Sequence, residues 1–69
     1  MLIKYFSDTD TALLEFSKKE VAETKDINEN IILDLDKEGN LVSMTIEHAK
    51  TKANILDFSF SQITEKAAA

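Results

Sequence analysis

Apolar and polar positions alternate on both sides of a short turn near the middle of the chain. The inward-facing residues of this pattern are Ile31, Leu33 and Leu35 before the turn, and Val42, Met44 and Ile46 after it. A period of two residues is typical of strands that bury one face. Gly39, the only glycine, lies in the turn, where a left-handed backbone would close it. The pattern therefore predicts an antiparallel hairpin.

Two loop lengths are compatible with this hairpin. A three-residue loop over 37–39, with a bulge at Gly39, would pair Leu35 with Leu41. A four-residue loop over 37–40 would pair Leu35 with Val42. The longer loop would also pair Leu33 with Met44 and Ile31 with Ile46. Because it matches apolar residues with apolar residues, we favour the four-residue loop.

Similar patterns elsewhere predict further elements around the hairpin. Residues 2–6 and 11–16 read as two strands, and 20–25 as a weaker, more polar edge strand. Residues 26–30 read as a loop, and 48–54 lack the strand period and suit a short helix. We therefore expect an α+β fold, a small antiparallel sheet in a meander of about five strands with a short C-terminal helix.

The first two strands carry apolar residues on both sides. Ile3, Tyr5 and Leu14 share one face, together with Ala12 and Phe16, whereas Phe6 and Leu13 lie on the other. We expect the face that bears Phe6 and Leu13 to be covered by a partner or by the C-terminal segment, in a homodimer or a hetero-complex.

Composition narrows the class of protein. The chain has 69 residues, no cysteine, no arginine and a net charge of −5. We expect one domain over 1–66, and residues 67–69 resemble a cloning scar and are left out of fold reasoning. The missing arginines and the acidity argue against direct nucleic-acid binding and favour a basic protein partner. No export signal or spanning segment is evident, so we expect no membrane association and a cytoplasmic location.

Candidate chemistry is sparse. Asp34, Asp36, Glu38 and Gly39 imitate an EF-hand loop, but Thr45 occupies the position that requires a bidentate glutamate. We therefore expect a solvated acidic turn, with no metal and no cofactor.

Acid–base catalysis has two weak candidates. His48 beside Glu47 could act as a general base, and Asp8 and Asp10 could approach Asp34 and Asp36 if the two hairpin ends met. A surface or capping histidine and turn aspartates bonded to backbone groups are the more usual cases. We expect no catalytic residues and no enzyme.

The segment after the helix is the better functional candidate. Leu56, Phe58 and Phe60 alternate with Asp57, Ser59 and Ser61. The segment suits either a last strand or arm packed on the domain's own sheet, or a segment that lies on another molecule by strand addition or with its aromatics in pockets. Residues 62–66 could add a helical turn. The residues that we expect to bind a partner are Leu56, Phe58, Phe60, Asp34 and Asp36.

Four stretches occur in an order that resembles a known family. They are Tyr5 with 10–14 (DTALL), 21–24 (VAET), 32–42 (ILDLDKEGNLV) and 45–49 (TIEHA). The chain resembles domain of unknown function 2283, a small bacterial and archaeal family, over about residues 2–60. One departure is Ser43, where many relatives have glycine. The resemblance implies antiparallel strands with a short helix, no established activity and no transferable catalytic residues. It also suggests a role beside a RelE-like toxin, because relatives are often encoded next to one.

From these observations we expect a non-enzymatic protein-binding module, an antitoxin-like partner of a basic toxin. The alternative is a structural protein that associates only with itself.

Overall fold

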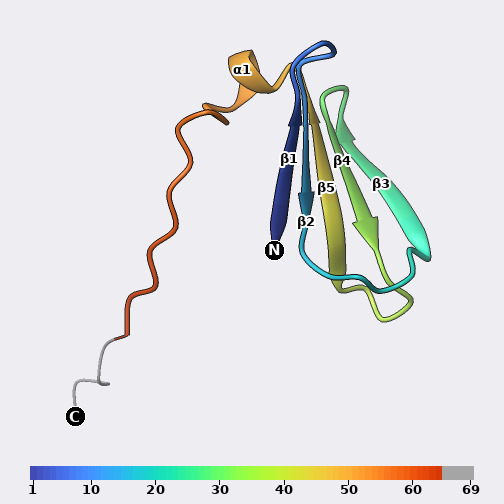
Figure 1. Cartoon of the computed structure of the whole chain (residues 1–69). Coiled ribbons are helices and arrows are strands. Elements are labelled where there is room, and N and C mark those ends of the chain that lie inside the picture. Colours follow the sequence, from blue (N-terminus) through green and yellow to red (C-terminus); the bar gives the residue numbers. More distant parts are fainter. Residues whose placement is uncertain (65–69) are drawn as a thin grey trace.

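The computed structural model describes residues 1–64, which form one five-stranded antiparallel sheet and one short helix (Figure 1). The strands are β1 (Leu2–Phe6), β2 (Thr11–Glu15), β3 (Glu23–Asn28), β4 (Ile31–Leu35) and β5 (Leu41–Glu47), and the helix is α1 (Ala49–Lys52). The expected α+β class is confirmed. The residues that we set aside as a tail, 67–69, lie outside the described residues.

The strands do not follow the order of a simple meander. Their order is β1-β2-β5-β4-β3, and every neighbouring pair is antiparallel. An N-terminal hairpin of β1 and β2 therefore joins a meander of β3, β4 and β5 through the β2–β5 ladder. Residues 17–22 make this possible, because they cross the end of the sheet to reach its far edge (Figure 1).

The central hairpin combines the two loops that we considered. Leu33 pairs with Met44, as the four-residue loop requires, but Leu35 pairs with Leu41 rather than with Val42. The register shifts between Asp34 and Leu35, so that Val42 is an extra residue in the ladder. This bulge lets a tight loop at the tip coexist with the apolar register along the strands. Our choice of the four-residue loop was therefore right for the strands and wrong at the tip.

The third strand lies later in the chain than we predicted. It covers Glu23–Asn28 instead of 20–25, because residues 20–22 are still part of the crossing segment. Ala22 ends this crossing by donating its N–H to the Leu35 carbonyl at 2.8 Å. The loop expected over 26–30 shrinks to two residues, where the Asn28 side chain accepts the Asn30 N–H at 2.7 Å.

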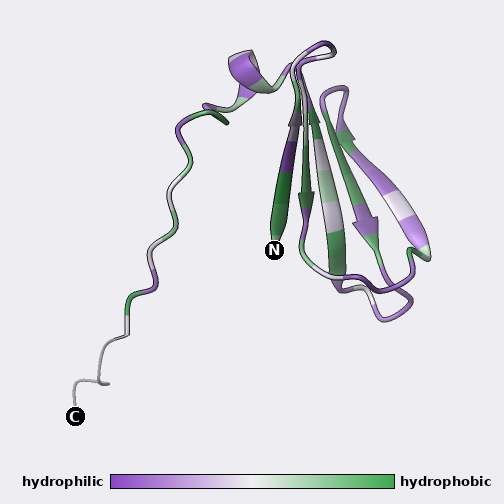
Figure 2. Ribbon diagram, in the orientation of Figure 1, coloured by the Kyte–Doolittle hydropathy of each residue, from purple (hydrophilic) through white to green (hydrophobic). Residues whose placement is uncertain are grey.

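The sheet has one apolar face and one polar face. The apolar face carries two rows of cross-strand neighbours: Ile3, Leu14, Met44 and Leu33 in one row, and Tyr5, Ala12, Ile46 and Ile31 in the other. The polar face carries Lys4, Glu15, Thr24, Asp26, Asp34, Ser43 and Thr45, with Leu2, Phe6, Leu13 and Ile32 among them. Hydrophilic colour along β3 contrasts with the hydrophobic colour of most of β2 (Figure 2).

The core lies at the α1 end of the apolar face. Ala12, Leu14 and Ile46 are buried there against Ala49 of the helix, and Ala53 and Ile55 pack against the cluster. The helix is shorter than the expected 48–54, since the chain is extended again at Ala53. Helix and sheet are therefore in contact over a small area.

Candidate functional site

The segment that follows α1 carries the aromatic residues that we expected to bind a partner. A turn closed by the Asp57 N–H and the Asn54 carbonyl, at 3.0 Å, directs the chain away from the helix. Beyond it, residues 58–64 adopt no helix or strand, so the helical turn expected over 62–66 is absent at 62–64, and 65–66 lie outside the described residues. We refer to residues 56–64 as the arm.

Apolar side chains of the arm are exposed. The exposed fractions are 67% for Leu56, 54% for Phe58 and 73% for Phe60. Phe58 and Phe60 line an open cleft with Met1 and Ile3, beside the apolar face. The segment is therefore not a sixth strand, and its phenylalanines lie beside Ile3 on the apolar face rather than over Phe6 and Leu13 as we had allowed. Whether it binds another molecule stays a prediction.

The helix α1, and with it the arm, is held in place at a corner. Residues that are far apart in the sequence form this corner. Asp10 accepts the Ala49 N–H at its carbonyl, at 2.9 Å, and the Lys50 N–H at Oδ1, at 3.1 Å. Asp10 and His48 both have left-handed backbones, with φ of 55° and 56°. Non-glycine residues seldom adopt this conformation, which persists where surrounding contacts enforce it.

Tyr5 completes this corner from the first strand. Its hydroxyl donates to Asp10 Oδ1 at 2.7 Å. This hydrogen bond lowers the pKa of Asp10 and raises the pKa of Tyr5 to about 12. From the sequence, Asp10 was interpreted as an ordinary turn residue, and its bonds to Tyr5 and to the start of α1 were missed. Its position in the turn that follows the strand with Tyr5 and Phe6 could have indicated the bond to Tyr5.

His48 is exposed at the same corner. Its Nδ1 lies 3.0 Å from Asn30 Oδ1, so among the described contacts an amide orients the ring, rather than the Glu47 carboxylate that we considered. Its backbone occupies the N-cap position of α1, but its side chain makes no capping hydrogen bond. His48 is therefore part of the corner, through its backbone and its contact with Asn30.

Asp36, in the central turn, is bonded to backbone groups, which is one of the two cases that we expected for a turn aspartate, and it is not solvated. Asp36 is only 6% exposed, and its Oδ1 accepts the N–H groups of Glu38 and Asn40, each at 2.9 Å. The backbone hydrogen bond from Asn40 is the main reason that the pKa of Asp36 is lowered. Asp36 therefore shapes the turn and cannot meet a partner as an exposed charge.

Asp34 is also engaged, although on the polar face. Its Oδ1 accepts from the Thr24 hydroxyl at 2.8 Å and its Oδ2 from the Ser43 hydroxyl at 2.7 Å. The hydroxyl of Ser43 thus links β5 to β4.

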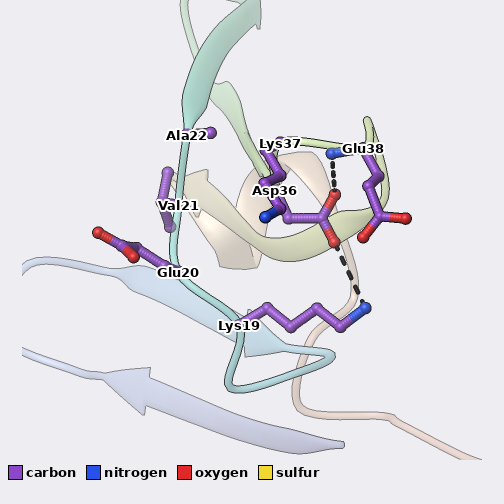
Figure 3. A pocket seen from close by; sticks show the side chains of 7 residues that line it. All are labelled: Lys19, Glu20, Val21, Ala22, Asp36, Lys37 and Glu38. Atoms are coloured by element: carbon purple, nitrogen blue, oxygen red, sulfur yellow. Dashed lines mark hydrogen bonds and ion pairs between the residues drawn. The ribbon is translucent and has the colours of Figure 1, made fainter.

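A pocket of about 500 Å³ separates the turn from the crossing segment (Figure 3). Its lining residues are Lys19, Glu20, Val21, Ala22, Asp36, Lys37 and Glu38. The Lys19 side chain runs beneath Asp36, and its ammonium lies 3.8 Å from Asp36 Oδ2 (Figure 3). Among residues 1–64 this oxygen has no hydrogen-bond partner. Because this oxygen is covered and opposed by a lysine, we assign the pair to the stability of the turn.

The structure does not bring the five predicted binding residues together. The arm follows α1 at one end of the sheet, whereas the turn with Asp36 lies at the other end (Figure 1). The same separation keeps Asp8 and Asp10 apart from Asp34 and Asp36. Within residues 1–64 no group of three or more acidic, histidine or cysteine side chains is placed to hold a metal ion. No helix in this range is long and apolar enough to cross a membrane.

Comparisons with known proteins identify a family for this chain, but no individual similar protein. Neither the curated proteins nor the solved structures contain a match. The family model described as Protein of unknown function (DUF2283) matches residues 2–50, which include all five strands and the corner. The match ends before the arm, short of residue 60 to which we extended the resemblance. The chain therefore belongs to the family of domain of unknown function 2283.

Proposed function

We propose that this chain is a non-enzymatic protein-binding module whose arm anchors a partner protein. The observation that carries the proposal is the exposure of Leu56, Phe58 and Phe60 on an arm held to the domain through Ile55. Aromatic side chains in desolvated pockets supply much of the binding energy of protein interfaces. The arm lies outside the matched family region. Family members that share the same sheet would then be able to bind different partners through this part of the chain.

Charge supports a basic partner. The chain carries 13 acidic side chains against 8 lysines, and the charged residues of the strands lie mainly on the polar face and on β3. A basic surface would be steered towards these charges and discriminated from acidic competitors. A basic RelE-like toxin, the class suggested by the family resemblance, has this chemistry, and the chain would then act as its antitoxin-like partner.

The experiment compares two sets of phenylalanine substitutions. Phe58→Ala with Phe60→Ala should weaken binding to a purified basic RelE-like protein by about 2–4 kcal/mol, as lost aromatic anchors do. Phe6→Ala is the matched control, because Phe6 is 45% exposed but lies on the polar face. Isothermal titration measures affinity, and urea unfolding followed by circular dichroism measures stability.

Two results would count against the proposal. If the double variant unfolds, the phenylalanines belong to the domain's own core, and the arm is not a binding element. If it stays folded and binds with unchanged affinity, the partner uses another surface.

Self-association is a second candidate, and a different surface favours it. Among the described residues, the packing of the helix on the apolar face is confined to the cluster of Ala49 with Ala12, Leu14 and Ile46.

A further inference from the structure

The two edges of the sheet differ in their protection. An edge strand presents unpaired N–H and C=O groups, and charged side chains help to keep other chains from pairing with them. The outer strands are β1 and β3. β3 carries Glu23, Lys25 and Asp26, whereas Lys4 is the only charged residue of β1, beside four apolar or aromatic ones. The β1 edge therefore needs a cover.

The arm lies close to this edge. Phe58 and Phe60 line an open cleft of about 380 Å³ with Met1 and Ile3. Ile55, just before the arm, packs against the core cluster that Ile3 also contacts. The chain then runs away from the α1 end of the sheet, in the direction opposite to β1 (Figure 1). An extended segment with this direction is suited to pair with β1 in the antiparallel manner.

One antiparallel register matches the residues of the cleft. If Phe58 lies opposite Ile3, Phe60 lies opposite Met1, because the two strands advance in opposite directions. Residues directly opposite one another share a face, so both phenylalanines would join the apolar face. A shift by one residue would turn them to the polar face. A shift by two residues in either direction would leave one of them without a partner in the cleft.

The same register matches the polar side of the arm. It places Asp57 opposite Lys4 and Ser59 opposite Leu2, on the polar face of the sheet. Opposite charges directly across a strand pair stabilise it. The Lys4 ammonium already lies 3.6 Å from Glu15 on the neighbouring strand, so it would lie between two carboxylates. The turn that directs the arm ends at Asp57 and can stay as it is.

We propose that the arm is a strap that closes on the β1 edge, pairing over residues 57–60, and that a partner protein must displace it. The structure shows the arm open, with Phe58 54% exposed and Phe60 73% exposed. Closure covers the two phenylalanines that a partner would bind, so the closed and the partner-bound states exclude each other. This competition rests on the proposed function, whereas closure itself does not.

Paired cysteines test the register, since the natural chain has none. Leu2→Cys with Ser59→Cys leaves the four residues of the cleft unchanged, and both positions are exposed. The matched control is Leu2→Cys with Ser61→Cys, which moves the second thiol two residues along the same side of the arm. Oxidation in dilute solution should form the intrachain disulfide at least about 10-fold faster in the first variant, because thiols two residues out of register lie too far apart.

Two results would overturn closure. Equal rates in the two variants would show that the arm moves freely beside the sheet, and disulfides formed mainly between chains would show that it pairs with another copy. Adding Phe58→Ala and Phe60→Ala to the Leu2→Cys, Ser59→Cys variant should abolish its advantage in rate, because the apolar contact in the cleft is removed. An advantage that persists would likewise refute the register. Mass spectrometry and non-reducing electrophoresis measure the products.

The partner experiment separates this inference from the proposed function. The oxidised Leu2→Cys, Ser59→Cys chain should bind a purified basic RelE-like protein at least about 10-fold more weakly than its reduced form, because the lock removes the binding-competent arm. If no matched register is found, but Phe58→Ala with Phe60→Ala weakens binding, closure is refuted and the binding function stands. If the locked and reduced chains bind equally well, the arm is not the binding element. The competition and the proposed function then both fail.

Discussion

Replacement of Gly39 tests the geometry on which the central hairpin depends. Gly39 has φ of 84° and donates its N–H to the Asp36 carbonyl at 3.0 Å. A Cβ atom built at this position meets no other atom within 4 Å. The cost of a side chain here is therefore backbone strain alone, with no steric contribution from neighbours.

That strain sets the magnitude of the effect. A left-handed backbone costs an ordinary L-residue about 1–2 kcal/mol, and a β-branched side chain resists it further. We expect Gly39→Val to lower the free energy of unfolding by more than about 1 kcal/mol. For a domain of this size, 1 kcal/mol corresponds to a fall in Tm of about 4–8 °C. Gly39→Asn should cost less than half as much, because asparagine tolerates this conformation.

Urea unfolding followed by circular dichroism compares the three proteins, with thermal melts as a second measurement. We expect the order of stability, from highest to lowest, to be glycine, asparagine and valine at position 39. If Gly39→Val is neutral, or no worse than Gly39→Asn, residue 39 is not left-handed in solution and the tight tip of the hairpin is wrong.

Three further predictions concern polar groups. Ser43→Ala should lower the free energy of unfolding by about 1 kcal/mol, because it removes the hydroxyl that donates to Asp34; an unchanged urea midpoint would show that this bond adds nothing. The lowered pKa values of Asp10 and Asp36 stabilise the fold above their ordinary value of 3.8, and this contribution should be lost as the pH falls through the lowered values. The raised pKa of Tyr5 acts in the opposite sense, so stability should decline as the pH rises from 10 to about 12. Urea midpoints across pH measure both, with Tyr5→Phe as the control that should flatten the alkaline limb.

Periodicity located most of the strands because each has one consistently apolar face. The alternation of Leu33 with Asp34 and of Met44 with Thr45 set the register along β4 and β5. It could not reveal the bulge at Val42, since Val42 and Ser43 are both buried in succession. β3 was misplaced for a related reason. All six of its residues are exposed, so burial leaves no period to read.

The candidate site was predictable only in part. The arm could be identified because Leu56, Phe58 and Phe60 alternate with polar residues after the last regular element. The burial of Asp36 could not be predicted, because it depends on the crossing segment and Lys19. Likewise the bond between Asp10 and Lys50 joins residues 40 positions apart, and no local pattern encodes it.

The ladder between β2 and β5 has a kinetic consequence. It joins the N-terminal hairpin to the rest of the sheet, and residues 17–22 provide the covalent connection. Closing a loop of about 30 residues costs roughly 3 kcal/mol of chain entropy, so this ladder should form after the local hairpins. A molecule in which the hairpin detaches would expose one unpaired edge on β2 and one on β5, with no charged residue on the apolar sides of these strands. That partly open species is the one from which hairpin exchange between chains, and then aggregation, would begin.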